Sequence, residues 1–156
     1  TPLHWASFSG ESNIISIFLQ HSALIDAVIE DGITPLHWAI QSGNLSSVTQ
    51  LISAGAVLSA QDNYGRGFLH WAVCLRQTDM VKLLLENGVS VDHTDKFGRT
   101  ALHWAAQIGD LDTVMYLVEY QAKVNLADRF DDRPLLIAAF FGHQRIVSYL
   151  FEKGAR

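Results

Sequence analysis

The apolar positions of the chain recur at a constant interval of 33 residues. A six-residue motif occurs five times in this register, reading TPLHWA, TPLHWA, GFLHWA, TALHWA and RPLLIA from residues 1, 34, 67, 100 and 133. Its third position is always Leu and its sixth is always Ala, as in Leu36 and Ala39. Positions 3, 6, 7 and 10 of a repeat lie on one side of an α-helix. The pattern therefore predicts a short first helix in each repeat, near 35–42, 68–75 and 101–108 in the interior repeats.

The ends of these helices, and a second helix in each repeat, are also marked in the sequence. Thr34 can cap a helix N-terminus and Pro35 suits a first turn. Gly43 and its equivalents accept the left-handed conformation in which many helices end. A further apolar stripe at positions 15, 18 and 19, which includes Val81 and Leu84, has the spacing of a buried helix face. We therefore expect a second helix over positions 12 to 21 of each repeat.

Tight turns separate successive helix pairs. The segments 62–65 and 95–98 read Asp-Asn-Tyr-Gly and Asp-Lys-Phe-Gly, which are typical turn sequences. Each unit is thus expected to consist of a helix, a turn, a second helix and a projecting hairpin-like loop. Because no single unit can bury its apolar face alone, stacking against its neighbours must supply the core.

The 33-residue period and the T-P-L-H-x-A motif resemble the ankyrin repeat. The resemblance divides the chain into four full repeats (1–33, 34–66, 67–99 and 100–132) and the helical part of a fifth (133–156). It implies a single domain over residues 1–156 with the fold of an all-α solenoid. The end repeats carry apolar residues, such as Phe18 and Phe151, where a capping repeat would be polar. We therefore expect the chain to be a fragment of a longer array.

Some positions depart from the repeat pattern. Gly67 stands where a capping Thr is expected, and Ile29 replaces the Asp of a turn. Arg76, Gln121 and Asp131 replace glycines. Asp tolerates the left-handed conformation better than most residues, so the turn at Asp131 should survive. We expect local loosening at the other positions, without loss of the fold.

Composition argues against several functions and locations. Apolar residues make up 49% of the chain, which argues against disorder. The net charge is −5 with no block of Lys and Arg, so nucleic acid is not an expected partner. The longest apolar run, residues 134–141, is far shorter than the ~20 residues of a membrane helix, so direct membrane insertion is not expected. The single Cys74 suits a reducing compartment, which favours an intracellular, cytoplasmic location.

One histidine in each full repeat invites comparison with a metal site. Stacked helices lie about 8–10 Å apart, whereas zinc ligands lie about 2 Å from the metal, so these side chains cannot share one ion. We interpret them as structural, each bonded to the capping residue and to the neighbouring loop. The sequence also contains no nucleophile elbow, zinc-protease motif or phosphate-binding loop. No enzyme activity, metal, cofactor or small-molecule substrate is therefore expected. The four histidines are His4, His37, His70 and His103.

Tryptophan is the informative departure from the usual ankyrin pattern. Four repeats carry Trp at position 5, opposite the Leu and Ala stripe, and the later loop tips carry aromatic and basic residues. In the family this face lines a concave groove, and aromatic and arginine side chains are enriched in binding hot spots. The Trp row either belongs to a recognition groove or packs under the loops and stiffens the stack; both interpretations stay open. The candidate site residues are Trp38, Trp71, Trp104, Tyr64, Phe97, Phe130, Arg66, Lys96 and Arg99.

The resemblance implies a non-catalytic module that binds another protein in the concave groove. We expect the partner to offer an extended or loop segment, apolar with some acidic character, centred on repeats two to four. The alternative is a structural spacer inside a larger enzyme, channel or scaffold. Asn125 lies at the loop position that asparaginyl hydroxylases modify in many ankyrin proteins, with Leu117 eight residues upstream. The other interpretation of Asn125 is that it only shapes its turn.

Overall fold

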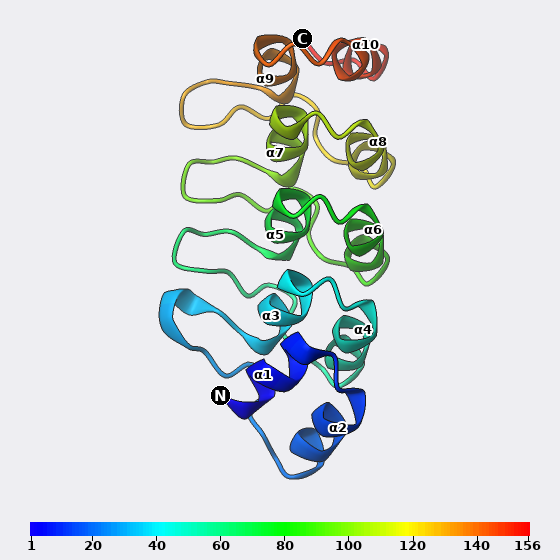
Figure 1. The fold of residues 1–156 in the computed structure, drawn as a ribbon. Coiled ribbons are helices and arrows are strands. Elements are labelled where there is room, and N and C mark those ends of the chain that lie inside the picture. The colour runs from blue at the N-terminus through cyan, green and yellow to red at the C-terminus, as the bar shows by residue number, and fades with distance from the viewer.

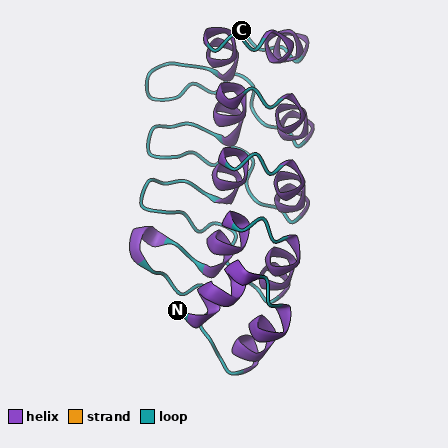
Figure 2. Ribbon diagram, viewed as in Figure 1, coloured by secondary structure: helices purple, strands orange, loops and turns teal.

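The computed structural model describes all 156 residues and contains ten α-helices, one short 3-10 helix and no strand (Figure 2). The first helices of the five pairs are α1 (Pro2–Ser9), α3 (Pro35–Gln41), α5 (Phe68–Cys74), α7 (Ala101–Ile108) and α9 (Pro134–Phe140). The second helices are α2 (Ser12–Gln20), α4 (Leu45–Ser53), α6 (Thr78–Glu86), α8 (Leu111–Glu119) and α10 (Gln144–Glu152). The 3-10 helix, η1 (Glu30–Gly32), lies in the first loop. The predicted first helices are confirmed to within one residue, and the all-α fold is confirmed.

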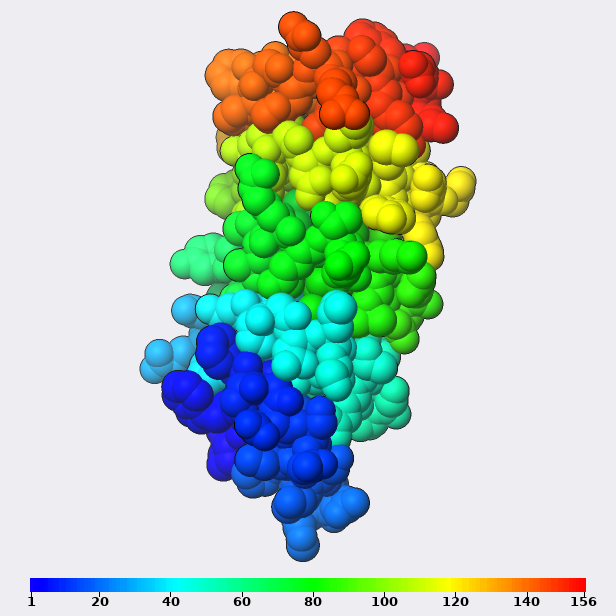
Figure 3. All heavy atoms as spheres, turned by 45° about the vertical axis from the view of Figure 1, so that its right-hand side comes forward, coloured from blue at the N-terminus to red at the C-terminus, as the bar shows by residue number.

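The helix pairs stack in one direction, so that the two termini lie at opposite ends of the molecule (Figure 1). Each first helix packs on the first helices of neighbouring pairs and on the second helix of its own pair. The long loops project from the side of the first helices (Figure 1). A space-filling view toward the second helices shows the units as successive bands along an elongated body (Figure 3). The first helices and the loops therefore share one face, which we call the helix–loop face.

The core is one continuous cluster of 30 buried apolar residues that runs the length of the stack. The Leu and Ala of the repeated motif belong to it, as Leu36 and Ala39 do in α3. The predicted stripe of the second helices also belongs to it, and Leu84 and Val81 are fully buried. Small alanines let neighbouring helices approach closely, while leucines fill the space between the layers. None of the ten helices combines the length and the apolar character that crossing a membrane requires.

The positions that depart from the repeat pattern keep its backbone geometry. Arg76 (φ 55°), Gln121 (φ 67°) and Asp131 (φ 63°) take the left-handed conformation that Gly43 (φ 73°) takes in its repeat. Such a conformation costs a residue with a side chain about 1–2 kcal/mol, and the surrounding turn enforces it. In the first loop, Ile29 donates its backbone N–H to Ile33 at 3.0 Å, as the turn residue of the next loop does. The repeat geometry is thus kept at these positions, and the local loosening expected there stays a prediction.

Candidate functional site

A buried aspartate organises each of the two interior loops. The Oδ1 atom of Asp62 accepts the backbone N–H groups of Tyr64 (2.8 Å) and Arg66 (2.9 Å), and its Oδ2 atom accepts the Arg66 Nε–H at 2.6 Å. Asp95 makes the same three bonds in the next loop. Burial raises the pKa of Asp62, but the hydrogen bonds from Arg66, Trp71 and Tyr64 outweigh it and hold this pKa below its usual value. The carboxylate is therefore the fixed centre of the loop.

Backbone hydrogen bonds join neighbouring loop tips into a row. Gly65 (φ 75°) permits this approach, because a Cβ there would lie 2.9 Å from the backbone nitrogen of Lys96. The row holds the aromatic tips outward, with exposed fractions of 56% for Tyr64, 46% for Phe97 and 70% for Phe130. Lys96 is exposed and makes no ion pair. The bonds run from Asn63 N–H to Asp31 O (2.7 Å), from Lys96 N–H to Tyr64 O (3.0 Å) and from Arg129 N–H to Phe97 O (2.9 Å).

Two of the tryptophans are bound to these loops. The indole N–H of Trp71 donates to Asp62 Oδ2 at 3.1 Å, and that of Trp104 donates to Asp95 Oδ2 at 3.2 Å. The Arg66 guanidinium carbon lies 5.2 Å from the centre of the Trp71 ring and 5.1 Å from that of Tyr64. Arg99 is placed in the same way between Trp104 and Phe97. Each guanidinium group is thus already held by an ion pair with a carboxylate and by cation–π contacts with two rings.

Trp38 has a different environment, although the sequence treats it as equivalent. Its loop has Ile29 in place of the aspartate, and its indole N–H has no hydrogen-bond partner. Its ring instead lies edge-on to Trp5 at 4.9 Å, with His4 at 5.6 Å and Phe8 at 5.9 Å between ring centres. Trp5 itself is 66% exposed. The tryptophans therefore form two groups, because only Trp71 and Trp104 donate their indole N–H to a loop.

Three of the four histidines bond both the start of their own helix and the neighbouring loop, as the structural interpretation expects. His103 Nδ1 accepts the Thr100 N–H at 3.1 Å, so the proton is on Nε2, which donates to the carbonyl of Asp132 at 3.3 Å in the next loop. His37 accepts from its own cap in the same way, but its buried Nε2 has no partner. Burial lowers the pKa of His37 and of His70 to about 4. No three His, Cys, Asp or Glu side chains are placed to hold a metal ion together.

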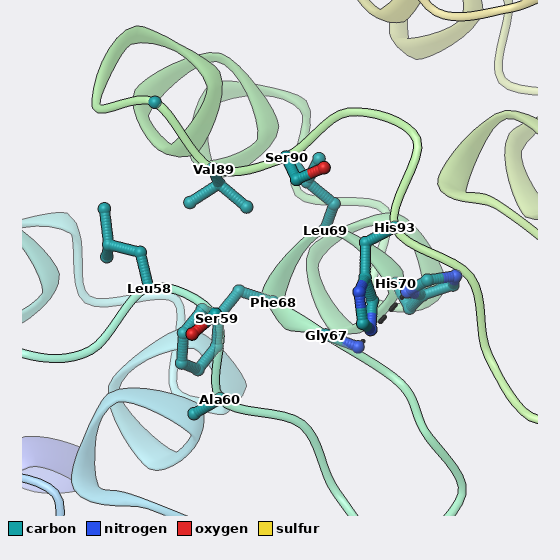
Figure 4. Close-up of a pocket in the computed structure, with 11 residues that line it drawn as sticks. Leu58, Ser59, Ala60, Gly67, Phe68, Leu69, His70, Val89, Ser90 and His93 are labelled. Atoms are coloured by element: carbon teal, nitrogen blue, oxygen red, sulfur yellow. Dashed lines mark hydrogen bonds between the residues drawn. The ribbon is translucent and has the colours of Figure 1, made fainter.

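The missing cap at Gly67 is compensated by a residue later in the same repeat. Gly67 still donates its N–H to His70 Nδ1 at 3.2 Å. A Cβ on Gly67 would lie 2.9 Å from the His93 ring, so this imidazole takes the space of the absent side chain (Figure 4). His93 Nε2 bonds the carbonyl of Gly65 at 2.9 Å. Beside it lies a cavity of about 190 Å³ whose lining includes Leu58 and contains no Asp, Glu, Lys or Arg.

Three residues of an aromatic surface at the end of the stack were not among the site residues predicted from the sequence. In α9 and at its C-terminal end, the exposed fractions are 51% for Leu136, 85% for Phe140 and 48% for Phe141. The rings of Phe97 and Phe130 stack nearby with centres 6.5 Å apart. We call these five residues the C-terminal aromatic patch. The signal in the sequence was Phe at positions 8 and 9 of repeat five, directly after the decayed motif.

Asn125 bonds to the chain end. Its Nδ2 donates to the carbonyl of Gly154 at 3.0 Å, and its Oδ1 accepts the N–H of Arg156 at 2.9 Å. These bonds agree with the turn-shaping interpretation. Hydroxylation of Asn125 stays a prediction.

Comparison with known families accounts for nearly the whole chain. The family model described as ankyrin repeats (3 copies) matches residues 1–62 and 69–156. The comparison with curated proteins finds no match. Ankyrin repeats are generally protein–protein interaction modules and are typically non-catalytic. With the matched segments covering the stacked helix pairs described above, the chain belongs to the ankyrin-repeat family.

Proposed function

We propose that the chain recognises another protein through its helix–loop face and catalyses no reaction. The observation that carries this proposal is the row of aromatic loop tips, Tyr64, Phe97 and Phe130, which are exposed on loops fixed by buried carboxylates. Rigid aromatic side chains lose little conformational entropy when a partner covers them. Each can supply about 2 kcal/mol or more at the centre of an interface.

The proposed partner segment is extended or loop-like, apolar, and partly acidic. Lys96 and Arg129 support the acidic character, because both are exposed at the tips and neither makes an ion pair. Arg66 and Arg99 contribute less than their sequence positions suggest, since each is paired with a buried aspartate. Free surface cations chiefly speed association with an acidic partner and make it sensitive to salt. The apolar residues of the partner would lie against the tips and the exposed edges of Trp38, Trp71 and Trp104.

The competing function is a structural spacer within a larger protein. One observation favours it: Trp71 and Trp104 satisfy their indole N–H groups inside the chain and are half-buried. The Trp row then stiffens the contact between loops and helices. Both functions are compatible with the proposed division into 33-residue repeats, and with a reducing, cytoplasmic location that suits the free Cys74.

Site-specific photo-crosslinking tests the proposal. A benzoylphenylalanine is incorporated at Tyr64 on the helix–loop face, or at Met115 on α8 as the control. Met115 is also exposed, at 36%, but lies on a second helix. We expect a discrete protein adduct in cell extract from the first position only.

The adduct is then identified, purified and titrated against single variants of the chain. Phe97→Ala should weaken its affinity about tenfold or more without lowering the melting temperature, and Lys96→Ala should reduce the association rate and its salt dependence. Equal crosslinking at both positions, or unchanged affinity of Phe97→Ala, would favour the spacer.

A further inference from the structure

The last loop keeps the backbone of the two interior loops but lacks two of their side chains. Asp128 Oδ1 accepts the N–H groups of Phe130 (2.8 Å) and Asp132 (3.0 Å), as the aspartates of the preceding loops do. In those loops, an Arg four residues later and a Trp nine residues later bind the second carboxylate oxygen. In the last loop these positions are Asp132 and Ile137. Asp128 Oδ2 consequently has no donor from the chain.

A pocket of about 510 Å³ lies at this place. Asp128 and Asp132 both belong to its lining, and neither is in an ion pair. The one cation in the lining, Arg99, is bound to Asp95 at 3.1 Å. The polar side of the pocket therefore carries two uncompensated negative charges.

The other side of the same pocket is apolar. Its lining there consists of Leu136, Ile137, Phe140 and Phe141. All of these except Ile137 are exposed and belong to the C-terminal aromatic patch. Phe130 also belongs to the lining, and it follows Asp128 by two residues as Tyr64 follows Asp62 in the second loop. Carboxylates next to an exposed ring and an aliphatic wall form a surface complementary to a flat cation on an apolar stem.

We infer that this pocket binds an arginine side chain of a partner protein, with an apolar residue next to it in the same segment. The chain contains the template for this contact: the Arg66 guanidinium binds Asp62 Oδ2 and lies over the Tyr64 ring. A partner guanidinium would bind Asp128 Oδ2 and lie over Phe130. The planar, multidentate guanidinium suits a carboxylate beside a ring better than the ammonium of lysine does.

This inference rests on the proposed function, because both place a partner on the helix–loop face. It goes beyond it in one respect, since it assigns a basic residue of the partner to the pocket beside the last loop, whereas the free cation of an interior tip, Lys96, favours acidic residues of the partner. The two can be tested separately, because the pocket residues Asp132 and Ile137 are distinct from Tyr64 and Lys96.

The test starts from peptides selected from a random display library on the complete 156-residue chain. Selected peptides should be enriched in an Arg flanked by aromatic or aliphatic residues. Replacing this Arg by citrulline keeps its shape and removes its charge, and should weaken the affinity about tenfold or more. The chain variant Asp132→Arg with Ile137→Trp fills the pocket with the side chains of the interior loops, and should weaken binding to a similar extent while its melting temperature does not fall.

Met115→Ala, at an exposed position of α8 away from the helix–loop face, serves as the control and should not change the affinity of these peptides by more than about twofold. The inference is overturned if the selection yields no binder, if Arg is not enriched, or if citrulline or the filled pocket leaves the affinity unchanged. Peptides that are weakened by Tyr64→Ala and unaffected by the filled pocket would support the proposed function and refute this inference.

Discussion

The indole nitrogen of Trp71 lies 3.1 Å from the carboxylate of Asp62, nine residues earlier in the chain. The same relationship joins Trp104 to Asp95 at 3.2 Å, whereas Trp38 follows a loop that has Ile29 at the equivalent position. A hydrogen bond to a charged, mostly buried acceptor is worth more than one between neutral groups, about 1.5–3 kcal/mol. The tryptophans at equivalent positions should therefore differ in what they contribute to stability.

We predict that Trp71→Phe costs about 1–2 kcal/mol more than Trp38→Phe. Both substitutions keep an aromatic ring and lose a similar volume, but only the first leaves the Asp62 carboxylate without its indole donor. Urea denaturation of the two variants measures this difference directly. Equal losses would show that the bond to Asp62 contributes nothing beyond ring packing.

A second prediction concerns the core. Leu84 is fully buried in the middle of α6, so Leu84→Ala should cost about 2–5 kcal/mol through lost burial and the cavity left behind. Lys96→Ala, at an exposed tip, should change the free energy of unfolding by less than about 0.5 kcal/mol. A cost below about 1 kcal/mol for Leu84→Ala would contradict the assignment of the second-helix stripe to the core.

Sequence reasoning succeeded where the information is local and repeated. The start of α3 at Pro35 and the burial of Leu84 follow from spacing within one repeat, and five copies of the pattern reinforce each other. It failed where the outcome depends on how a loop folds back on itself or on which residues the stack leaves exposed. Nothing in the period shows that Arg66 is used up by Asp62, because that requires knowing which way the loop folds back. Phe140 was likewise not chosen as a site residue, because the repeat pattern does not show which aromatic residues the stack leaves exposed. It is the most exposed aromatic residue of the chain.

The pair Gly67 and His93 provides a third prediction. Gly67→Thr alone should destabilise the chain by about 1–3 kcal/mol, because its Cβ would lie 2.9 Å from the His93 ring. The backbone of Gly67 has φ −86°, which suits Thr, and the equivalent of His93 in the preceding repeat is Ala60. Combining Gly67→Thr with His93→Ala should therefore recover most of the loss, since the new hydroxyl can reach His70 as Thr100 reaches His103.

A double-mutant cycle with the two single variants checks this compensation. We expect a favourable coupling energy of about 1 kcal/mol or more between the two sites. Additive losses would mean that His93 does not replace the missing cap. The bond from His93 to the Gly65 carbonyl is lost in both variants that carry His93→Ala, so it cancels in the coupling energy.

The buried histidines make stability depend on pH in a defined direction. Burial lowers the pKa of His37 and of His70 to about 4 in the folded chain, against about 6.5 in the unfolded chain. Between these values the unfolded state binds protons that the folded state does not, so unfolding takes up protons and stability falls as the pH is lowered. The full stability is present above about pH 6.5. The lowered pKa values of Asp62 and Asp95 act in a separate window, because their contribution is lost only as the pH falls below the usual carboxylate range.

We predict that lowering the pH from 7.5 to 5 reduces the free energy of unfolding by about 2 kcal/mol for each of these two histidines. The measurement is urea denaturation at several pH values, read as the slope of the unfolding free energy against pH. His70→Gln removes one of the groups that take up a proton on unfolding. The slope of the unfolding free energy against pH should therefore be smaller for this variant, even though the variant is less stable at every pH. Ser59→Ala, at an exposed position without a titratable group, is the control and should leave the slope unchanged. A slope that His70→Gln does not alter would mean that this imidazole is protonated in the folded chain, and its bonds to Gly67 N–H and to the Arg99 carbonyl could not then both be made as described.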